Sequence, residues 1–318
     1  MNKVLILGGT GFVGTHVCEK LNQRSCSTTV ATRHSANARH LQPMPMVEVL
    51  EADVHDPAAL AELVAGHDAV VNLVAILHGS EAAFEKTHVQ LPQKLVQACQ
   101  ASGVRRIVHI SALGASLESA SMYQRTKARG EAVLRGSGLD VTLLRPSVMF
   151  GAEDKFLNAF ARLQAMFPVI PLAASSARFQ PVWVEDVARA VLHCLVDTHT
   201  IGKIFEACGP DVFTLKQLVQ LAGRHAGING GRGRPIIALP DALARLQARL
   251  MELAPGEPLL SRDNLDAMKT DNVASGQLPG LEALGIHPAA LAAIAPTYLG
   301  TRDVNSGLIA RRKTAGRF

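Results

Sequence analysis

The chain has 318 residues, of which 48% are hydrophobic and 19% are charged, so it can bury a large core and is not a disordered chain. The net charge of +5 is concentrated in residues 301–318, which hold five basic residues and one acid. The body is therefore nearly neutral, which argues against a nucleic-acid-binding domain, and no apolar run is long enough to span a membrane.

Six short apolar runs in the first half of the chain are typical of buried parallel strands. They are KVLILG, TTVATR, VEVLEA, DAVVNLVAIL, RRIVHIS and DVTLLRPS. The segments between them have the spacing of amphipathic helices, and in one of them Asp56, Pro57 and Gly66 mark the start and the end. Continuously apolar strands that alternate with helices predict an α/β fold, a doubly wound parallel sheet of Rossmann type with helices on both faces.

The second half of the chain is less regular and predicts a smaller mixed lobe. VWVEDVARAVLHCLVD indicates a strand end and a helix, and KIFEACG indicates one more strand. Thr214 is predicted to cap the helix in DVFTLKQLVQLAGRHAG, and LPDALARLQARLMEL places Leu243, Leu246 and Leu250 on one side of a helix. We assign residues 1–150, together with about 177–207, to a dinucleotide-binding domain. Residues 151–176 and 208–300 are assigned to a smaller C-terminal lobe on the substrate side. Residues 301–318 are assigned to a basic tail.

A glycine-rich loop joins the first predicted strand to the first predicted helix. Gly8, Gly11 and Gly14 follow the strand at regular spacing and open the helix. Glycine allows the tight turn and the close approach of a diphosphate, and the helix N-terminus offers unpaired N–H groups to it. This context predicts a dinucleotide site.

The end of the second strand bears on which dinucleotide is bound. Arg33 lies nineteen residues after Gly14, where a carboxylate would favour NAD, and no acid occurs from Thr28 to His40. An arginine there suits a 2′-phosphate, so NADP(H) is favoured and NAD(H) stays possible. Asp53 ends the third strand, where it either lies near the adenine or is an ordinary turn acid. The residues predicted to bind the cofactor are Gly8, Thr10, Gly11, Phe12, Val13, Gly14, Arg33, Asp53, Val54, Val74, Ala75, Lys127 and Pro146.

Tyr123 and Lys127 are four residues apart in MYQRTKARGE, which places both side chains on one face of a helix. Together with the glycine loop, Asp53-Val54, VVNLVAI, RIVHISALGAS and LRPSVMFG, they give the chain a resemblance to the extended short-chain dehydrogenase/reductases over about its first 210 residues. The resemblance implies that Lys127 binds the nicotinamide ribose and lowers the pKa of Tyr123. It also implies that Tyr123 exchanges a proton with a substrate oxygen while hydride moves at carbon.

The third member of the catalytic set departs from the pattern of that superfamily. The usual serine position falls on Ala112, one residue after Ser111, so Ser111 is expected to point to the other side of the strand. Ser111 remains the candidate hydroxyl, with Ser116 and Ser121 as alternatives. His88, where extended members often carry asparagine, is expected to be a structural helix residue.

The downstream half is similar to bacterial relatives of the NADPH-binding accessory subunit 9 of respiratory complex I, an atypical branch of the superfamily. GASLESASMYQRTKARGE, PVWVEDVARAV, FEACGPDVFTLKQLVQL and RDNLDAMKTDNVAS carry this resemblance. It implies either an NAD(P)(H)-dependent oxidoreductase or epimerase-like enzyme acting on an unknown small molecule, or a non-catalytic nucleotide-binding structural or sensor protein.

The histidines and cysteines form no metal-binding spacing, so no metal is expected. The scattered cysteines, odd in number, indicate reduced thiols. We therefore expect a cytoplasmic protein, associated peripherally with a membrane complex if the structural alternative holds.

Overall fold

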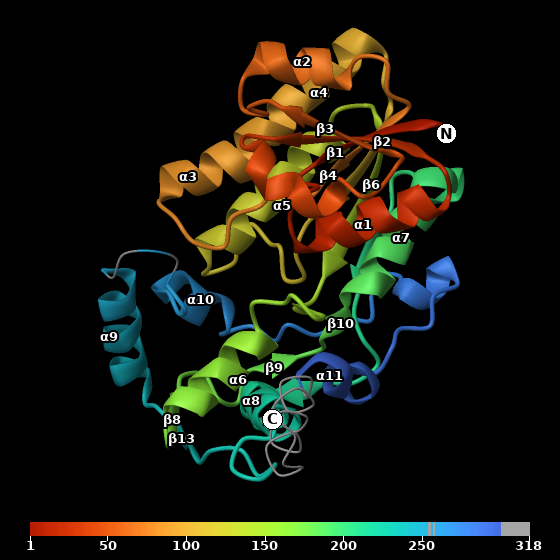
Figure 1. Cartoon of the computed structure of the whole chain (residues 1–318). Coiled ribbons are helices and arrows are strands. Elements are labelled where there is room, and N and C mark those ends of the chain that lie inside the picture. The colour runs from red at the N-terminus through yellow and green to blue at the C-terminus, as the bar shows by residue number, and fades with distance from the viewer. Residues whose placement is uncertain (254–255, 257, 300–318) are drawn as a thin grey trace, which may run out of the picture.

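A computed structural model of the chain describes residues 1–253, 256 and 258–299 and contains a central parallel sheet (Figure 1). Within these residues the sheet has seven strands in the order β11-β6-β5-β4-β1-β2-β3, as predicted for a doubly wound fold. The strands are β1 (Lys3–Leu7), β2 (Ser27–Thr32), β3 (Val47–Glu51), β4 (Ala69–Asn72), β5 (Arg106–Ile110), β6 (Asp140–Pro146) and β11 (Ile204–Ala207).

Helices cover both faces of this sheet. On one face α1 and α7 pack on Val4, Ile6 and Val108. On the other face the helices α2, α4 and α5 pack on Leu5 and Ile107. The strand residues that face the two layers of helices come from alternate positions of the same strands. These strands are therefore apolar at every position. The helices are α1 (Phe12–Gln23), α2 (Pro57–Val64), α4 (Leu91–Ser102), α5 (Met122–Arg135) and α7 (Val184–Val196).

The smaller lobe lies below the carboxyl edge of the sheet in Figure 1 and is built from short strands and helices. Its core brings together Phe150, Leu157, Leu218 and Leu291. Its helices are α6 (Leu157–Met166), α8 (Leu215–His225), α9 (Asp241–Glu252), α10 (Arg262–Ala267) and α11 (Leu291–Leu299). Its two-stranded pairs are β7 (Met149–Phe150) with β10 (Val182–Trp183), β8 (Ile170–Leu172) with β13 (Ile236–Ala238), and β9 (Arg178–Phe179) with β12 (Phe213–Thr214).

The local helix signals read from the sequence agree with the structure. Asp56 caps α2 by accepting a hydrogen bond from the Ala58 amide, and Thr214 caps α8 in a capping box with Gln217. A strand was expected in VVNLVAI, and β4 is found there but is shorter than expected. The strand β4 ends at Asn72 because the Asn72 side chain turns back to accept a hydrogen bond from the Val74 amide.

The segment RDNLDAMKTDNVAS joins the lobe to the sheet. The Asn272 side chain accepts hydrogen bonds from the Ser147 hydroxyl (2.6 Å) and the Val148 amide (3.2 Å), and its main chain pairs with Arg178 and Gln180. The domain boundaries given above remain our proposal, and the basic tail at 301–318 lies outside the described residues.

Candidate functional site

The glycine loop forms a tight cradle at the carboxyl end of β1. Gly8 has φ of +84°, a conformation that favours glycine, and its carbonyl accepts a hydrogen bond from the Gly11 amide. A Cβ atom at Gly14 would lie 2.4 Å from the Gly8 oxygen and 2.5 Å from the Gly9 Cα. Only glycine at position 14 therefore lets α1 approach the loop this closely.

The first turn of α1 is open to an anion. Gly11 is the N-cap residue, no side chain caps the helix, and its first turn contains no acid. The unpaired N–H groups and the positive end of the helix dipole therefore face the loop. Thr10, Phe12 and Val13 are half-buried around this turn. The cradle and the uncapped helix together fit a dinucleotide diphosphate.

The loop after β2 is basic, but the structure adds an acid that the sequence reading missed. Arg33 is exposed directly after Thr32, and His40 reaches back to Thr15 on α1, with 2.9 Å between Nε2 and Oγ1. Glu51, at the end of β3, accepts a hydrogen bond from the Ser35 amide at 3.1 Å. Because β2 and β3 are neighbours, their ends meet at this loop.

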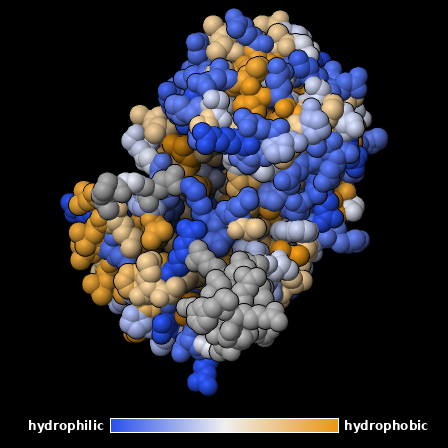
Figure 2. Space-filling view, viewed as in Figure 1, coloured by the Kyte–Doolittle hydropathy of each residue, from blue (hydrophilic) through white to orange (hydrophobic). Residues whose placement is uncertain are grey.

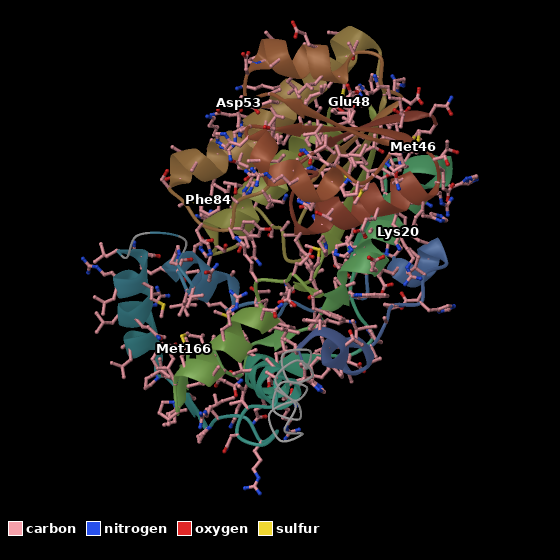
Figure 3. The ribbon with its side chains drawn as sticks, in the orientation of Figure 1. Lys20, Met46, Glu48, Asp53, Phe84 and Met166 are labelled. Carbon is pink, nitrogen blue, oxygen red and sulfur yellow. The ribbon has the colours of Figure 1, made fainter. Side chains whose placement is uncertain are left out.

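Asp53 adopts the role of a turn acid in this structure. Its Oδ1 accepts a hydrogen bond from the His55 amide at 3.0 Å, and its carbonyl accepts one from the Asp56 amide. The side chain of Asp53, labelled in Figure 3, is exposed, and the adjacent Val54 is buried according to its solvent exposure. A contact of Asp53 with adenine stays a prediction.

Three more predicted residues lie at the carboxyl ends of strands. Val74 and Ala75 follow β4, and a Cβ atom on Gly8 would come within 3.2 Å of the Val74 nitrogen. Pro146 ends β6, and its carbonyl accepts a hydrogen bond from the Leu113 amide. The topology thus brings the ends of β1, β4 and β6 to one edge of the sheet.

Tyr123 and Lys127 lie one turn apart on α5, as predicted. Lys127 is 2% exposed, and its Nζ donates a hydrogen bond to the Ile110 carbonyl at 2.7 Å. Burial lowers the pKa of Lys127 to about 8, although Glu131 one turn further along acts in the opposite direction. Glu131 is itself fixed by two hydrogen bonds from Arg145 of β6.

The phenol of Tyr123 lies in an apolar setting. Its ring packs edge-on against His88 at 5.4 Å and against Phe84 at 6.3 Å between ring centres. Burial, with a smaller contribution from the negative charge of Asp263, raises the pKa of Tyr123 to about 12. In this arrangement the phenol is therefore held protonated at neutral pH, and the lowering of its pKa by Lys127 that the family resemblance implies stays a prediction.

Asp263 is a site residue that the sequence reading missed. It comes from α10, about 140 residues beyond Tyr123 in the chain. Its carboxylate accepts hydrogen bonds from the Ser121 hydroxyl (2.8 Å), the Met122 amide (2.5 Å) and the Tyr123 amide (3.2 Å). A carboxylate at the N-terminus of α5 stabilises the helix that carries the pair. No local sequence signal connects α10 with α5.

Ser111 lies on the face of the sheet that carries the pair. Ile107 packs on α4 and α5, and period-two alternation places His109 and Ser111 on the same face. Burial lowers the pKa of His109, and the nearby charge of Lys127 acts in the same direction. The expectation that Ser111 points away from the pair is therefore not supported. The Ser111 hydroxyl is buried and has no hydrogen-bond partner among the described residues.

Ser111 is one of several unsatisfied polar side chains near the ends of β4 and β5. Among the described residues, Asn72 Nδ2 and His109 Nδ1 are also buried without a partner. Asn72 and His109 are register partners on adjacent strands. Burying a polar atom without a hydrogen bond costs about 1–3 kcal/mol, so this cluster opposes folding.

Of the two alternative serines, Ser121 uses its hydroxyl both as acceptor and as donor, and Ser116 is exposed. Ser121 caps α5, accepting a hydrogen bond from Gln124 while it donates one to Asp263. The Ser116 hydroxyl accepts a hydrogen bond from the Glu118 amide. Ser111 is therefore the better candidate for a substrate-facing hydroxyl.

His88 lies in one turn of π-helix, Lys86–Gln90, between α3 (Glu81–Glu85) and α4. Its Nε2 accepts a hydrogen bond from the Ile76 amide at 3.2 Å, so Nδ1 carries the proton and donates to Thr126 at 3.0 Å. Burial lowers the pKa of His88 to about 3. The structural role expected for His88 is confirmed, because both of its nitrogens are engaged.

One cluster of potential metal ligands exists within the part of the chain that the structure describes. Ligand atoms of His16, Glu19 and Glu185 lie within 4.8 Å of one another. Glu185 is already bound by His16 Nδ1 and Lys20 Nζ, each at 2.5 Å. These contacts tie α1 to α7 and require no metal.

Comparisons with known proteins define the class. A family model described as NAD(P)H-binding matches residues 8–198. The fold is shared by a dTDP-glucose 4,6-dehydratase from Streptomyces venezuelae solved with NAD bound, with a TM-score of 0.72, 21% identity and coverage of 93% of this chain and 95% of that one. A UDP-glucose 4-epimerase from Thermus thermophilus, also with NAD, has a TM-score of 0.67, 19% identity and coverage of 93% and 97%. The chain is thus an NAD(P)H-binding protein with an epimerase/dehydratase-like fold.

Sequence relatives narrow the family. The mitochondrial NADH dehydrogenase (ubiquinone) 1 alpha subcomplex subunit 9 of Rattus norvegicus is 32% identical, over 90% of this chain and 76% of the relative. A ceramide reductase from Caulobacter vibrioides is 27% identical, over 75% and 74%. The chain belongs to the NAD(P)H-binding family that includes subunit 9 of respiratory complex I. In the described part of the chain, no helix has the length and apolar character needed to cross a membrane.

Proposed function

We propose that the chain is an NADP(H)-dependent oxidoreductase of the short-chain dehydrogenase/reductase type, with epimerase-like chemistry as a variant of the same site. The glycine loop and the start of α1 would hold the diphosphate, and Lys127 would bind the nicotinamide ribose. A bound nicotinamide supplies or accepts the hydride.

Tyr123 is suited to donate a proton rather than to accept one. Its pKa of about 12 keeps the phenol protonated at neutral pH, so it can protonate a substrate oxygen as hydride adds to the carbon. The Lys127 ammonium then stabilises the resulting phenolate, and the Ser111 hydroxyl donates a hydrogen bond to the same oxygen. This arrangement favours the reduction of a carbonyl compound.

The observation that carries the proposal is the unsatisfied Ser111 hydroxyl. It is buried on the α5 face of the sheet, next to the Ile110 carbonyl that Lys127 binds. A hydroxyl held there without a partner destabilises the fold, which is expected of a group that binds a substrate.

The test is cofactor oxidation over a panel of carbonyl compounds and quinones, with wild type compared with Tyr123→Phe. Tyr298→Phe is the matched control, because Tyr298 lies on α11 and is the other tyrosine of the chain. We expect a loss of about 10²-fold or more for Tyr123→Phe, in the range of general acid catalysis. Equal rates in wild type and Tyr123→Phe would remove Tyr123 from the mechanism.

A second function, a nucleotide-binding structural or sensor protein at a respiratory complex, is supported by two observations. Ala112 occupies the usual serine position, and subunit 9 is among the relatives. In this function the protein is cytoplasmic and associates peripherally with the inner face of the membrane. Purification from native membranes tests it, and recovery solely as a free monomer would count against it.

The preference for NADP(H) rests on Arg33. Arg33→Ala should weaken binding of NADPH much more than binding of NADH in calorimetric titration. Glu51→Gln should act in the opposite direction, because it removes a negative charge from the end of the strand next to Arg33. Similar changes for both cofactors would overturn the 2′-phosphate assignment.

A further inference from the structure

The helix α9 is amphipathic with its larger apolar side chains outward. Ala244 and Ala248 face inward and pack with Ala173 and Leu265. The opposite side carries three exposed leucines, Leu243 (52% exposed), Leu246 and Leu250, and the C-cap residue Leu253 continues the row at 77% exposed. Ten residues of helix separate the first from the last, so the row is about 15 Å long.

The row continues onto the neighbouring ribbon of β8 and β13. The inner side of this ribbon is formed by Ile170, Leu172 and Ile236. On its outer side Ile237 is exposed, and its register partner on β8 is Pro171. Leu239, between β13 and α9, donates a main-chain hydrogen bond to Leu172, which fixes the helix beside the ribbon. We call the exposed set the leucine face; it comprises Leu243, Leu246, Leu250, Leu253, Ile237, Met166, Phe167 and Val169.

The leucine face lies at the outer rim of the smaller lobe. Figure 2 shows hydrophobic atoms gathered along the left edge of this lobe, where Figure 1 places α9. Met166, labelled in Figure 3, lies in the same part of the lobe. Exposed apolar patches of this kind mark interaction sites, and this one is formed by the outer sides of a helix and a ribbon.

The charged residues around the leucine face indicate which kind of partner it binds. The segments that carry the face, 162–172 and 232–253, contain five arginines and two acids, and one of the arginines, Arg245, is paired with Asp266 of α10. Glu252 accepts two hydrogen bonds from Arg262, whereas Arg249 is exposed between Leu246 and Leu250. A second copy of the chain fits less well, because pairing α9 with its own image brings two sets of arginines together.

We propose that the leucine face docks on an anionic lipid surface, with α9 lying in the plane of the interface. Leucine and phenylalanine side chains would enter the acyl boundary, and the arginines would contact lipid phosphates. This inference adds a lipid contact to the peripheral association proposed above and does not depend on turnover. It also places the membrane next to α10, which holds Asp263 on the helix of Tyr123.

The test is flotation of the full chain with vesicles of phosphatidylcholine and phosphatidylglycerol in equal parts, and with phosphatidylcholine alone. We expect binding to the mixed vesicles that weakens with salt, and weaker binding to the neutral ones. Leu246→Glu with Leu250→Glu should reduce partitioning by more than about tenfold. Val196→Glu is the matched control, because Val196 is 63% exposed at the end of α7 and Leu250 is 61% exposed.

Four results of these experiments would support or overturn docking of the leucine face on lipid. Both variants keep residues 301–318, so unchanged flotation of the double variant would assign binding elsewhere and overturn the proposal. Absence of wild-type flotation would also overturn it. A wild-type dimer in light scattering that the double variant dissociates would assign the face to a second copy. Dinucleotide affinity is measured on the same samples. A variant that binds the dinucleotide normally but does not float with vesicles has lost lipid docking and not the nucleotide site.

Discussion

Asp263→Asn is expected to lower the pKa of Tyr123 and to loosen the start of α5. The amide has nearly the same shape as the carboxylate but carries no charge, and only one of its two polar atoms accepts hydrogen bonds. At least one of the three donors from Ser121, Met122 and Tyr123 therefore loses its partner.

The size of both effects follows from these contacts. Losing a charge-assisted hydrogen bond and the favourable charge at the helix N-terminus should destabilise the protein by about 2 kcal/mol. Burial is the larger cause of the high Tyr123 pKa, so removing the Asp263 charge should lower it by less than about one unit of the two-unit rise. At pH 11 the ionised fraction of Tyr123 should then rise from about 10% to at most about half.

The same pKa has a consequence for stability. The pKa of Tyr123 is higher in the folded protein than in the unfolded chain. The protonated phenol therefore contributes fully to the free energy of unfolding below pH 10, and this contribution is lost as the pH rises towards 12. The loss is about 3 kcal/mol in wild type and smaller in Asp263→Asn.

The assay is tyrosinate absorbance in a Tyr298→Phe background, in which Tyr123 is the single tyrosine. Thermal unfolding at neutral pH gives the stability. Asp266→Asn is the control, because Asp266 lies on the same helix but pairs with Arg245 and Lys269. Half-ionisation of Tyr123 near pH 10 in both the Asp263 variant and its parent would refute the reasoning.

Three further predictions follow from the site. Gly14→Ala should unfold the protein or abolish nucleotide binding, because its Cβ would lie 2.4 Å from a main-chain oxygen. In Gly11→Ala the same distance is 3.4 Å, so this variant should show a normal circular dichroism spectrum and bind NADPH more weakly. Ser111→Ala should leave the free energy of unfolding in urea unchanged or raise it by about 1 kcal/mol, while reducing turnover of any substrate found; a clear destabilisation would contradict the missing partner. Lys127→Met should lose nucleotide affinity; because the folded pKa of Lys127 is depressed to about 8, wild type should gain stability relative to the variant between pH 8 and 10.5, and a constant difference would contradict that pKa.

The sequence reading succeeded where the signals are local. The strand before Gly8, the helix after Gly14 and the spacing of Tyr123 and Lys127 are each set by a few adjacent residues. It extended β4 too far, because the apolar residues after Asn72 do not reveal that the Asn72 side chain ends the strand.

The misses are contacts between distant segments. Glu51 meets the loop of Arg33 only because β2 and β3 are neighbours, and Asp263 reaches α5 only once the lobe has folded. The periodicity of α9 correctly grouped Leu243, Leu246 and Leu250 on one side. It could not show that this side faces solvent, because the inward positions are held by alanines.

The cap that Asp263 provides has a consequence for biosynthesis. A ribosome releases Tyr123 and Lys127 long before it has made α10, so the nascent Rossmann strands assemble around a helix whose N-terminus is incomplete. The site helix is finished only when most of the chain has emerged. A chain that is cut short before residue 263 therefore keeps every motif of the nucleotide loop and still lacks the carboxylate that holds Tyr123 in place.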